Sequence, residues 1–341
     1  MDRHPAPRAL TPAAKRSLRI MFVAKHALAD GSPHAEDGTH ATYHREMRLV
    51  LEGMGFDLAI ADSYRALFER PDVDFVFPLL NRGGFLNSEM MLPLLCNRHG
   101  LPYLGASPIL RGLSDDKHLT KRLAVAHGLP TAPWAVFRRG APVEEANCPV
   151  GRRFVVKPNA SSASWGITAA GDWNGVRTAV RKLHAEGHDA IVEPFIDGHD
   201  IEVSVVTLNG RPLVLPTQIV MQDDPTMLRT YGEKRNLEAG QAYAIRPLLD
   251  PLVAALVESR TRLLLEEFRP FDYGRFEFRL DVETGEAQFL EVNLNCNLWS
   301  QKTIALAAAQ IGWSHAQLVE TILTESLERH GLLNDVVELA A

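Results

Sequence analysis

Charged and apolar side chains alternate in two segments near the C-terminus. The first segment reads YGRFEFR from residue 273, and the second reads QFLEVN from residue 288. Successive side chains of a strand point to opposite faces of a sheet, so residues two apart share a face. We therefore expect Arg275 and Glu277 on one face of the first strand. Glu291 and Asn293 should share one face of the second.

The segment between these two strands, DVETGE, carries the signal of a hairpin turn. A three-residue loop with Gly285 in the left-handed conformation fits this sequence. It places Glu277 opposite Glu291, and Arg275 opposite Asn293. Two facing carboxylates destabilise a sheet unless a cation lies between them, and carboxylates beside an amide suit Mg²⁺ bound to a phosphate. Taken alone, a solvated face of an antiparallel sheet explains the alternation equally well.

Two more strand ends carry a charged residue where chemistry could occur. Lys157 ends an apolar strand before a loop of small residues, where the Lys and backbone N–H groups could meet phosphate oxygens. Glu193 interrupts an apolar strand and could bind the edge of a purine. Asp200 and Glu202 share a face of the next strand. The alternatives are an exposed Lys before a Pro turn and a strand-end acid in water.

The totals describe a globular protein with more than one domain. The chain has 341 residues, 46% of them hydrophobic and 23% charged, which predicts two or three domains. No apolar run approaches the ~20 residues of a membrane span, and the net charge of -6 argues against nucleic-acid binding. The three scattered cysteines indicate a reducing cytoplasm and no disulfide framework.

The order of strand and helix signals predicts an α/β unit followed by α+β units. Residues 1–17 lack a secretory signal and are expected to form a disordered tail. Strands and helices alternate through 18–112, which predicts a Rossmann-like parallel α/β domain. Residues 113–197 and 198–335 are expected to form two further units. In the last unit we expect one strand over Leu213–Val220 and a helix opening at Asp250 with these apolar positions on one face: Leu252, Leu256, Leu263 and Leu264.

The ordered set of motifs resembles an ATP-grasp ligase, and most closely the D-alanine–D-alanine ligase branch. The likeness covers residues 18 to about 328. It is carried by the following motifs: Asp116-Lys117, Val156-Lys157-Pro158, Glu193-Pro-Phe-Ile-Asp-Gly-His-Asp200-Ile-Glu-Val203, Lys234, Gly274-Arg275-Phe-Glu277 and Glu291-Val-Asn293. Arg82-Gly-Gly84 resembles part of the branch's N-terminal domain. Each motif is weak alone, whereas the ordered set is specific.

The resemblance implies an ATP-grasp fold and a role for each matching position. The residues implied to bind ATP are Lys117, Lys157, Glu193, Phe195, Ile196 and Asp200. The residues implied to bind two Mg²⁺ ions, with Mn²⁺ as a substitute, are Glu277, Glu291 and Asn293. The residues implied in catalysis are Arg275 beside the developing negative charge, Lys234 on the phosphate side, and Ser164 in a loop that closes over the phosphates.

The positions that would meet the substrates depart from the family pattern. Leu80-Asn81 replaces His-Gly before the Arg-Gly-Gly motif, and Phe85-Leu86 replaces Glu-Asp after it. Further along, Cys296-Asn297 replaces Pro-Gly, and a lysine replaces a serine. The candidate substrate-binding residues are Arg82, Asn297 and Lys302.

These departures predict a carboxylate–amine ligase that acts through an acyl phosphate on amino acids other than two D-alanines, in specialised metabolite biosynthesis. The expected partners are small-molecule amino acids, with no nucleic acid and no membrane, and a homodimer is an open option. A true D-alanine–D-alanine ligase is one alternative. An ATP-grasp kinase and a non-catalytic nucleotide-binding regulator are alternatives of another class.

Overall fold

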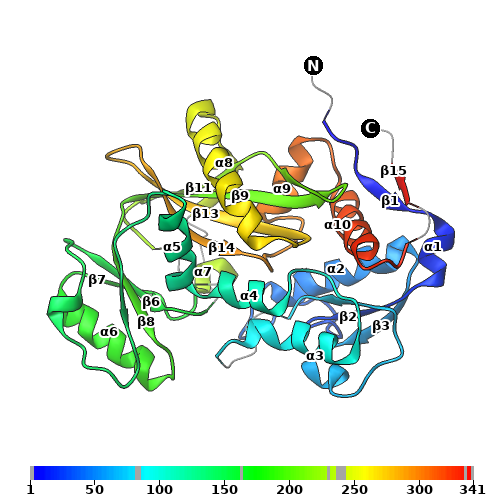
Figure 1. The fold of residues 1–341 in the computed structure, drawn as a ribbon, viewed down its shortest axis with the longest axis horizontal. Coiled ribbons are helices and arrows are strands. Elements are labelled where there is room, and N and C mark those ends of the chain that lie inside the picture. Colours follow the sequence, from blue (N-terminus) through cyan, green and yellow to red (C-terminus); the bar gives the residue numbers. More distant parts are fainter. Residues whose placement is uncertain are drawn as a thin grey trace.

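The computed structural model describes residues 4–80, 86–161, 164–228, 231–235, 243–333 and 336–338. In this part of the chain the strands form four sheets. Figure 1 shows the N-terminal parallel sheet and the central sheet at opposite ends of the molecule, with the largest sheet between and above them. No described helix has the length and apolar character needed to cross a membrane.

The N-terminal unit is a parallel sheet in the order β3-β2-β4, as the alternation of strand and helix signals predicts. Its elements are β2 (Arg19–Val23), α2 (His40–Met54), β3 (Asp57–Ala61), η1 (Tyr64–Leu67), β4 (Phe75–Pro78), η2 (Ser88–Met90) and α3 (Met91–His99). One face of the sheet shares its core with the last two helices of the chain, since Phe22 and Phe77 belong to the same apolar cluster as Ile304 and Leu318. The two ends of the sequence therefore pack as one body.

The expectation of a disordered tail over 1–17 is wrong for residues 8–17. Arg8–Leu10 form strand β1, which pairs with β15 (Val336–Glu338). Pro12–Ser17 form helix α1. The buried Arg8 side chain forms ion pairs with Glu325 at 2.6 Å and Glu328 at 2.5 Å. The partners lie more than 300 positions along the chain, so no local pattern could reveal them.

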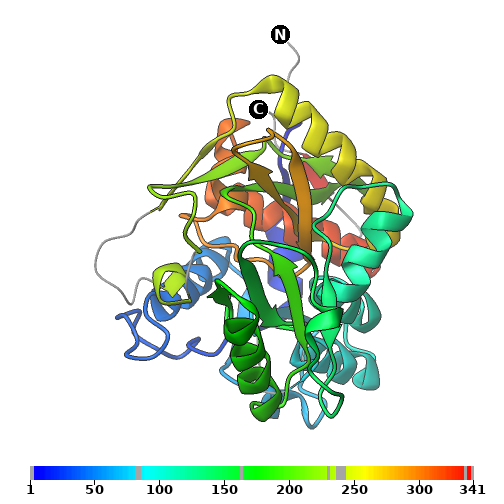
Figure 2. The same cartoon turned by 90° about the vertical axis from the view of Figure 1, so that its left-hand side faces the viewer.

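The central unit is an antiparallel sheet in the order β5-β8-β6-β7, with a helix on it (Figure 2). Its elements and the helices that lead into it are α4 (Pro108–Asp115), α5 (Lys117–Ala126), β5 (Ala135–Phe137), η3 (Glu145–Asn147), β6 (Phe154–Pro158), β7 (Thr168–Ala170), α6 (Trp173–Ala185) and β8 (Ala190–Pro194). This sheet has its own apolar cluster, centred on Val156, Val180 and Val192.

The C-terminal unit holds the largest sheet, in the order β12-β11-β9-β13-β14, with β10 also paired to β9. Its elements are β9 (Gly198–Leu208), β10 (Arg211–Val214), β11 (Gln218–Gln222), α7 (Tyr231–Arg235), β12 (Tyr243–Pro247), α8 (Pro251–Leu265), η4 (Glu266–Phe268), β13 (Tyr273–Asp281), β14 (Ala287–Asn293), α9 (Thr303–Gln310) and α10 (His315–Arg329). The mixed α/β and α+β class is confirmed, and the boundaries between units stay predictions.

Two details of this unit differ from the sequence predictions. The single strand expected over Leu213–Val220 is interrupted between β10 and β11, where Pro216 has no N–H to donate to the sheet. In α8 the buried residues include Val257 and Leu264, whereas Leu252 is 81% exposed. The helix has apolar residues on several sides, so periodicity alone did not identify its buried face.

Arg8→Met should strongly destabilise the protein, because it leaves the buried carboxylate of Glu325 without its cation. Breaking a buried ion pair in this way costs about 3–5 kcal/mol. Urea unfolding measures the loss. Arg16→Met, which removes an exposed charge from α1, is the matched control and should change the free energy of unfolding by less than about 0.5 kcal/mol. Equal effects of the two variants would contradict the docking of β1.

Candidate active site

The hairpin β13–β14 brings the two predicted acidic residues opposite each other. Glu277 pairs with Glu291, and Arg275 pairs with Asn293, as predicted. The loop differs, because the N–H of Asp281 donates to the C=O of Glu286 at 2.9 Å and encloses four residues rather than three. A bulge in the ladder beyond Glu277 offsets the longer loop and restores the register at the acidic pair. Gly285 has the expected left-handed conformation, with φ of 69°.

The carboxylate of Glu277 lies in a buried cluster of charges. Arg275 contacts Glu277 at 2.7 Å and Glu202 at 3.2 Å, and the hydroxyl of Thr303 also donates to Glu202. Burial and the carboxylates of Glu291 and Glu202 raise the pKa of Glu277, although Arg275 opposes this shift. The guanidinium of Arg275 is thus already paired with two acids.

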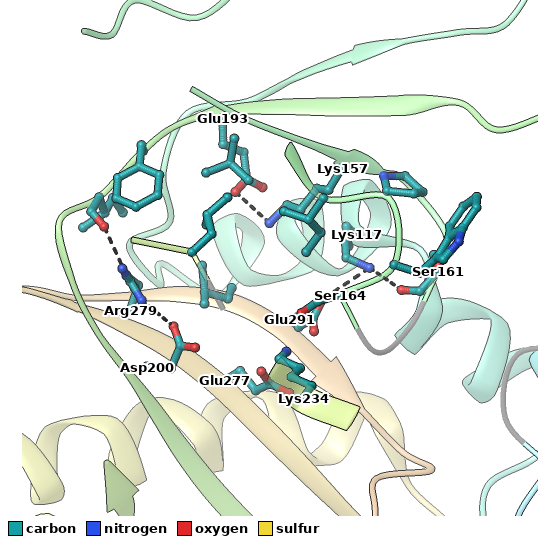
Figure 3. Close-up of a pocket in the computed structure, with 18 of the residues that line it drawn as sticks. Lys117, Lys157, Ser161, Ser164, Glu193, Asp200, Lys234, Glu277, Arg279 and Glu291 are labelled. Carbon is teal, nitrogen blue, oxygen red and sulfur yellow. Dashed lines mark hydrogen bonds and ion pairs between the residues drawn. The ribbon is translucent and has the colours of Figure 1, made fainter. Parts of the chain in front are cut away.

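A cleft of about 880 Å³, open to solvent, separates the central sheet from the C-terminal sheet. Figure 3 shows Glu193 and Lys157 on one side, Glu277 and Lys234 on the other, and Lys117 beside Glu291. The predicted site residues that line the cleft are Lys117, Lys157, Ser164, Glu193, Phe195, Ile196, Asp200, Lys234, Glu277 and Glu291.

Buried lysines surround the acids at one end of the cleft. Lys117 contacts Glu291 at 3.3 Å and donates to the C=O of Ser161 at 2.7 Å. Burial alone would raise the pKa of Glu291, but Lys117 and two further lysines together lower it. Glu291 is therefore a carboxylate at neutral pH, in a region of positive charge.

Glu193 is bound by two lysines. Lys157 approaches one oxygen at 2.9 Å and Lys121 the other at 3.2 Å, and all three residues are buried. Burial would raise the pKa of Glu193, but the lysines lower it. The sequence analysis missed Lys121, although it follows Lys117 by one helical turn on α5 and so shares its face.

The segment after β8 forms the far end of the cleft. The N–H of Phe195 donates to the C=O of Arg153 at 2.8 Å, and the C=O of Ile196 accepts from Arg279 at 3.1 Å. Arg279 also pairs with Asp200 at 2.9 Å. These two backbone groups are therefore bonded within the protein, and Arg279 fixes the Asp200 carboxylate at the cleft wall.

Two predicted catalytic residues reach the cleft from other segments. Lys234 lies on the short helix α7, and Ser164 has a left-handed backbone with φ of 59°. A non-glycine residue in this conformation is uncommon. Ser164 lies between β6 and β7 and lines the cleft.

Of the three predicted substrate residues, the two that the structure describes lie away from the cleft. Asn297 accepts the N–H of Trp299 at 2.8 Å in a local turn, and the Lys302 ammonium lies 5.9 Å from the Trp299 ring. Neither lines the cleft. Arg82 lies outside the described residues. The predicted metal ligand Asn293 lines a smaller adjoining cavity.

This smaller cavity holds residues that the sequence analysis did not identify. Its walls are Glu89, Arg111, Ser114, Asp115, Lys117, Ser161, Glu291, Val292, Asn293 and Asn295. Burial raises the pKa of Asp115 to about 7, and the nearby acids Glu89 and Glu291 add to the shift, against Lys117. The lining residues come from η2, α4, α5, the segment after β6 and the end of β14.

Comparison with known proteins gives consistent matches. A family model described as the D-ala D-ala ligase C-terminus matches residues 123–324. The uncharacterized protein y4sG of Sinorhizobium fredii is 30% identical over 250 residues, which is 70% of either chain. A D-alanine–D-alanine ligase of Bordetella petrii is 26% identical over 67% of this chain and 68% of its own length.

A solved structure supports the fold. The D-alanine–D-alanine ligase from Bacillus anthracis, complexed with ATP, superimposes with a TM-score of 0.71 at 16% identity, over 92% of this chain and 99% of that chain. The predicted ATP-grasp fold is thereby confirmed.

Asp115→Asn should stabilise the protein increasingly as the pH rises. The pKa of Asp115 is about 7 in the folded protein and near 3.9 when unfolded. Unfolding therefore releases a proton between these values, and stability falls as the pH rises through this window, by at most about 1.4 kcal/mol per pH unit. Urea unfolding at pH 5 and pH 8 measures it. The variant's advantage should be larger at pH 8, and an equal advantage at both would contradict the burial of this carboxylate.

Proposed function

The chain belongs to the D-alanine–D-alanine ligase family, and we propose that it is an ATP- and Mg²⁺-dependent carboxylate–amine ligase acting on amino acids. The observation that carries this proposal is the pair of buried Glu277 and half-buried Glu291, facing across β13 and β14 in a cleft lined by lysines. Such a pair is stable only with cations around it. A solvent-exposed sheet face does not explain the pair, because Glu277 is only 4% exposed.

The donor set fits divalent ions bound to phosphate oxygens. Glu277, Glu291 and Asn293 offer carboxylate and amide oxygens, which are the ligands that Mg²⁺ prefers. We propose that they hold two Mg²⁺ ions, with Mn²⁺ as a substitute. When bound, the ions would neutralise charge on the transferred phosphoryl group.

The lysines would bind the nucleotide phosphates. Lys117 and Lys157 line the cleft with their ammonium groups near carboxylates, and Lys234 approaches from α7. We propose that the adenine lies against the Phe195–Ile196 segment, and that Asp200, fixed by Arg279, accepts hydrogen bonds from the ribose hydroxyls. Ser164 lies where the loop would close over the phosphates.

The chemistry follows from the need for a leaving group. An amine cannot displace oxygen from a carboxylate, so the γ-phosphoryl group of ATP would pass to that carboxylate and form an acyl phosphate. The amine would then attack the carbonyl carbon, expel orthophosphate and form the amide. Arg275, held by Glu202 and Glu277, would stabilise the developing oxyanion. Closure of the cleft would exclude water from the acyl phosphate.

Two observations bear on the substrates. Several relatives are named D-alanine–D-alanine ligases, which makes two D-alanines the first pair to test. Lys302 and the turn at Asn297 lie away from the cleft. The proposal that the substrates are amino acids other than two D-alanines, in specialised metabolism, therefore rests on the departures of the sequence from the family pattern. A homodimer and, from the three free cysteines, a reducing cytoplasm are further proposals.

Glu291→Gln should abolish Mg²⁺-dependent turnover, because the neutral amide is a poor ligand and leaves Lys117 without its ion pair. We expect at least a hundredfold loss, measured by ADP release with Mg²⁺ as the varied component. Glu283→Gln, in the exposed turn of the same hairpin, is the matched control and should retain activity. A folded Glu291→Gln protein with near-normal turnover would contradict the assignment of Glu291 as a Mg²⁺ ligand.

Product stoichiometry distinguishes a ligase from a kinase on the same nucleotide site. The acyl-phosphate route releases one ADP and one orthophosphate for each amide formed. Coupled ADP and phosphate assays with mass spectrometry of the product measure all three. A stable phosphorylated product without free phosphate would establish the kinase, and no ADP release with any substrate would favour a nucleotide-binding regulator.

A panel of amino-acid pairs decides the substrate. If the departures reflect a changed pocket, D-alanine alone should give ADP release at least tenfold slower than the best pair. If D-alanine is the best substrate at millimolar concentration, the departures are drift and the chain is a D-alanine–D-alanine ligase.

A further inference from the structure

The acidic pair of the hairpin belongs to a longer row of carboxylates across three strands. Glu277 of β13 is in register with Glu291 of β14 on one side and with Glu202 of β9 on the other. Residues in register on neighbouring strands share a face of the sheet. Glu202 is only 2% exposed and is not a wall of the cleft. A ligand in the cleft therefore meets the other two acids but not Glu202.

Arg275 is the cation that joins Glu202 to this row. Its Nη1 atom lies 3.2 Å from a carboxylate oxygen of Glu202. Its Nη2 and Nε atoms donate to Oε1 of Glu277 at 2.7 and 3.0 Å. Burial alone would lower the pKa of Arg275, but Glu202 and Glu277 raise it. One guanidinium is thus shared by two carboxylates on neighbouring strands.

The carboxylate of Glu202 is also held by a second element. The hydroxyl of Thr303, the first residue of α9, donates to the same oxygen of Glu202 that contacts Arg275. Glu202 and Thr303 are both buried, and β9 is bordered by a strand on each side. The position of this carboxylate is therefore fixed by the sheet and by α9, independently of the cleft.

The negative charge of Glu277 has two possible partners. In the proposed function this carboxylate is a ligand of a divalent ion, and Arg275 already contacts one of its oxygens. A guanidinium and a divalent ion on one carboxylate share a single negative charge and repel each other. Without another acid, Arg275 would therefore weaken the binding of an ion by Glu277. Glu202 is the acid with which Arg275 can stay paired.

We propose that Glu202 is a positioning residue that neutralises Arg275 and so leaves the Glu277 carboxylate available to a divalent ion. The guanidinium then stays between β9 and β13 while Glu277 binds the ion, close to where the developing oxyanion would lie. Glu202 acts only through Arg275, because it is buried behind the cleft wall. The role of Glu277 as an ion ligand rests on the proposed function.

The affinity of the folded protein for Mn²⁺ tests this role without turnover. Mn²⁺ is titrated into the full-length protein saturated with a non-hydrolysable ATP analogue, and electron paramagnetic resonance measures the free ion. Glu202→Gln should weaken Mn²⁺ binding about fivefold or more, because Arg275 then depends on Glu277 alone. Ser204→Ala is the matched control, since Ser204 is buried on the same face of β9 and its hydroxyl has no hydrogen-bond partner. It should leave the affinity unchanged.

The same substitution in an Arg275→Met background separates this role from the general loss of a negative charge. If Glu202 acts through Arg275, Glu202→Gln should change the Mn²⁺ affinity by less than about twofold once Arg275 is replaced. A direct electrostatic effect of Glu202 on the ion would give the same loss in both backgrounds. If Glu202→Gln does not fold, Glu202→Asp, which moves the charge away from Arg275 by one methylene, takes its place and should give a smaller loss.

The proposal is overturned if the Glu202 variants bind Mn²⁺ as the wild type does, or if they weaken binding equally in both backgrounds. Failure of the proposed function gives different results. Wild-type affinity in Glu277→Gln would reject the ion site itself, and the role of Glu202 with it. Weak Mn²⁺ binding by Glu277→Gln and Glu202→Gln, in a protein that releases no ADP and phosphate, would support the role of Glu202 and reject the ligase.

Discussion

The candidate site depends on pairs between buried lysines and carboxylates along the cleft. Lys117 reaches from α5 to Glu291 on the C-terminal sheet, and Lys157 pairs with Glu193 within the central sheet. Removing such charges from water is expensive, and apolar residues of similar size often stabilise a fold as well or better. A charged lining is therefore explained better by a ligand than by stability. In a triphosphate with bound divalent ions, the phosphates would bind the lysines and the ions would bind the carboxylates.

The two walls of the cleft pack around separate apolar clusters. The central sheet packs around Val156 and Val180 in an apolar cluster of its own. The sheet that carries the acidic hairpin packs around another cluster, which includes Phe276 and Phe289. Helix α5 packs on the second cluster through Ala124, so the ion pair between Lys121 of α5 and Glu193 of β8 joins the two walls. Apolar contacts hold each wall rigid, while ion pairs can exchange partners when a charged ligand enters.

Local patterns predicted the acidic hairpin well, and the reason is physical. Alternation fixes which residues share a face, and a glycine at a turn limits the register to a few choices. The register at Glu277–Glu291 was right even though the loop is one residue longer, because a bulge compensates for it. Where the determining contact was distant, prediction failed. Arg8 is fixed by Glu325 of α10, and nothing in the first residues of the chain reveals that partner.

The smaller cavity could not be predicted from motifs, because most of its residues belong to none. Glu89, Arg111 and Asn293 come from three separate elements, and only the packing of η2 and α4 against the edge of β14 brings them together. The nucleotide side differs in one respect that matters for function. There, Lys157 and Lys121 both have carboxylate partners within the protein, so that wall is stable before a ligand binds. In the smaller cavity, by contrast, the buried Nε and Nη1 atoms of Arg111 lack acceptors. Such unpaired buried donors cost stability, and no sequence motif indicates them, because they result from how α4 packs against its neighbours.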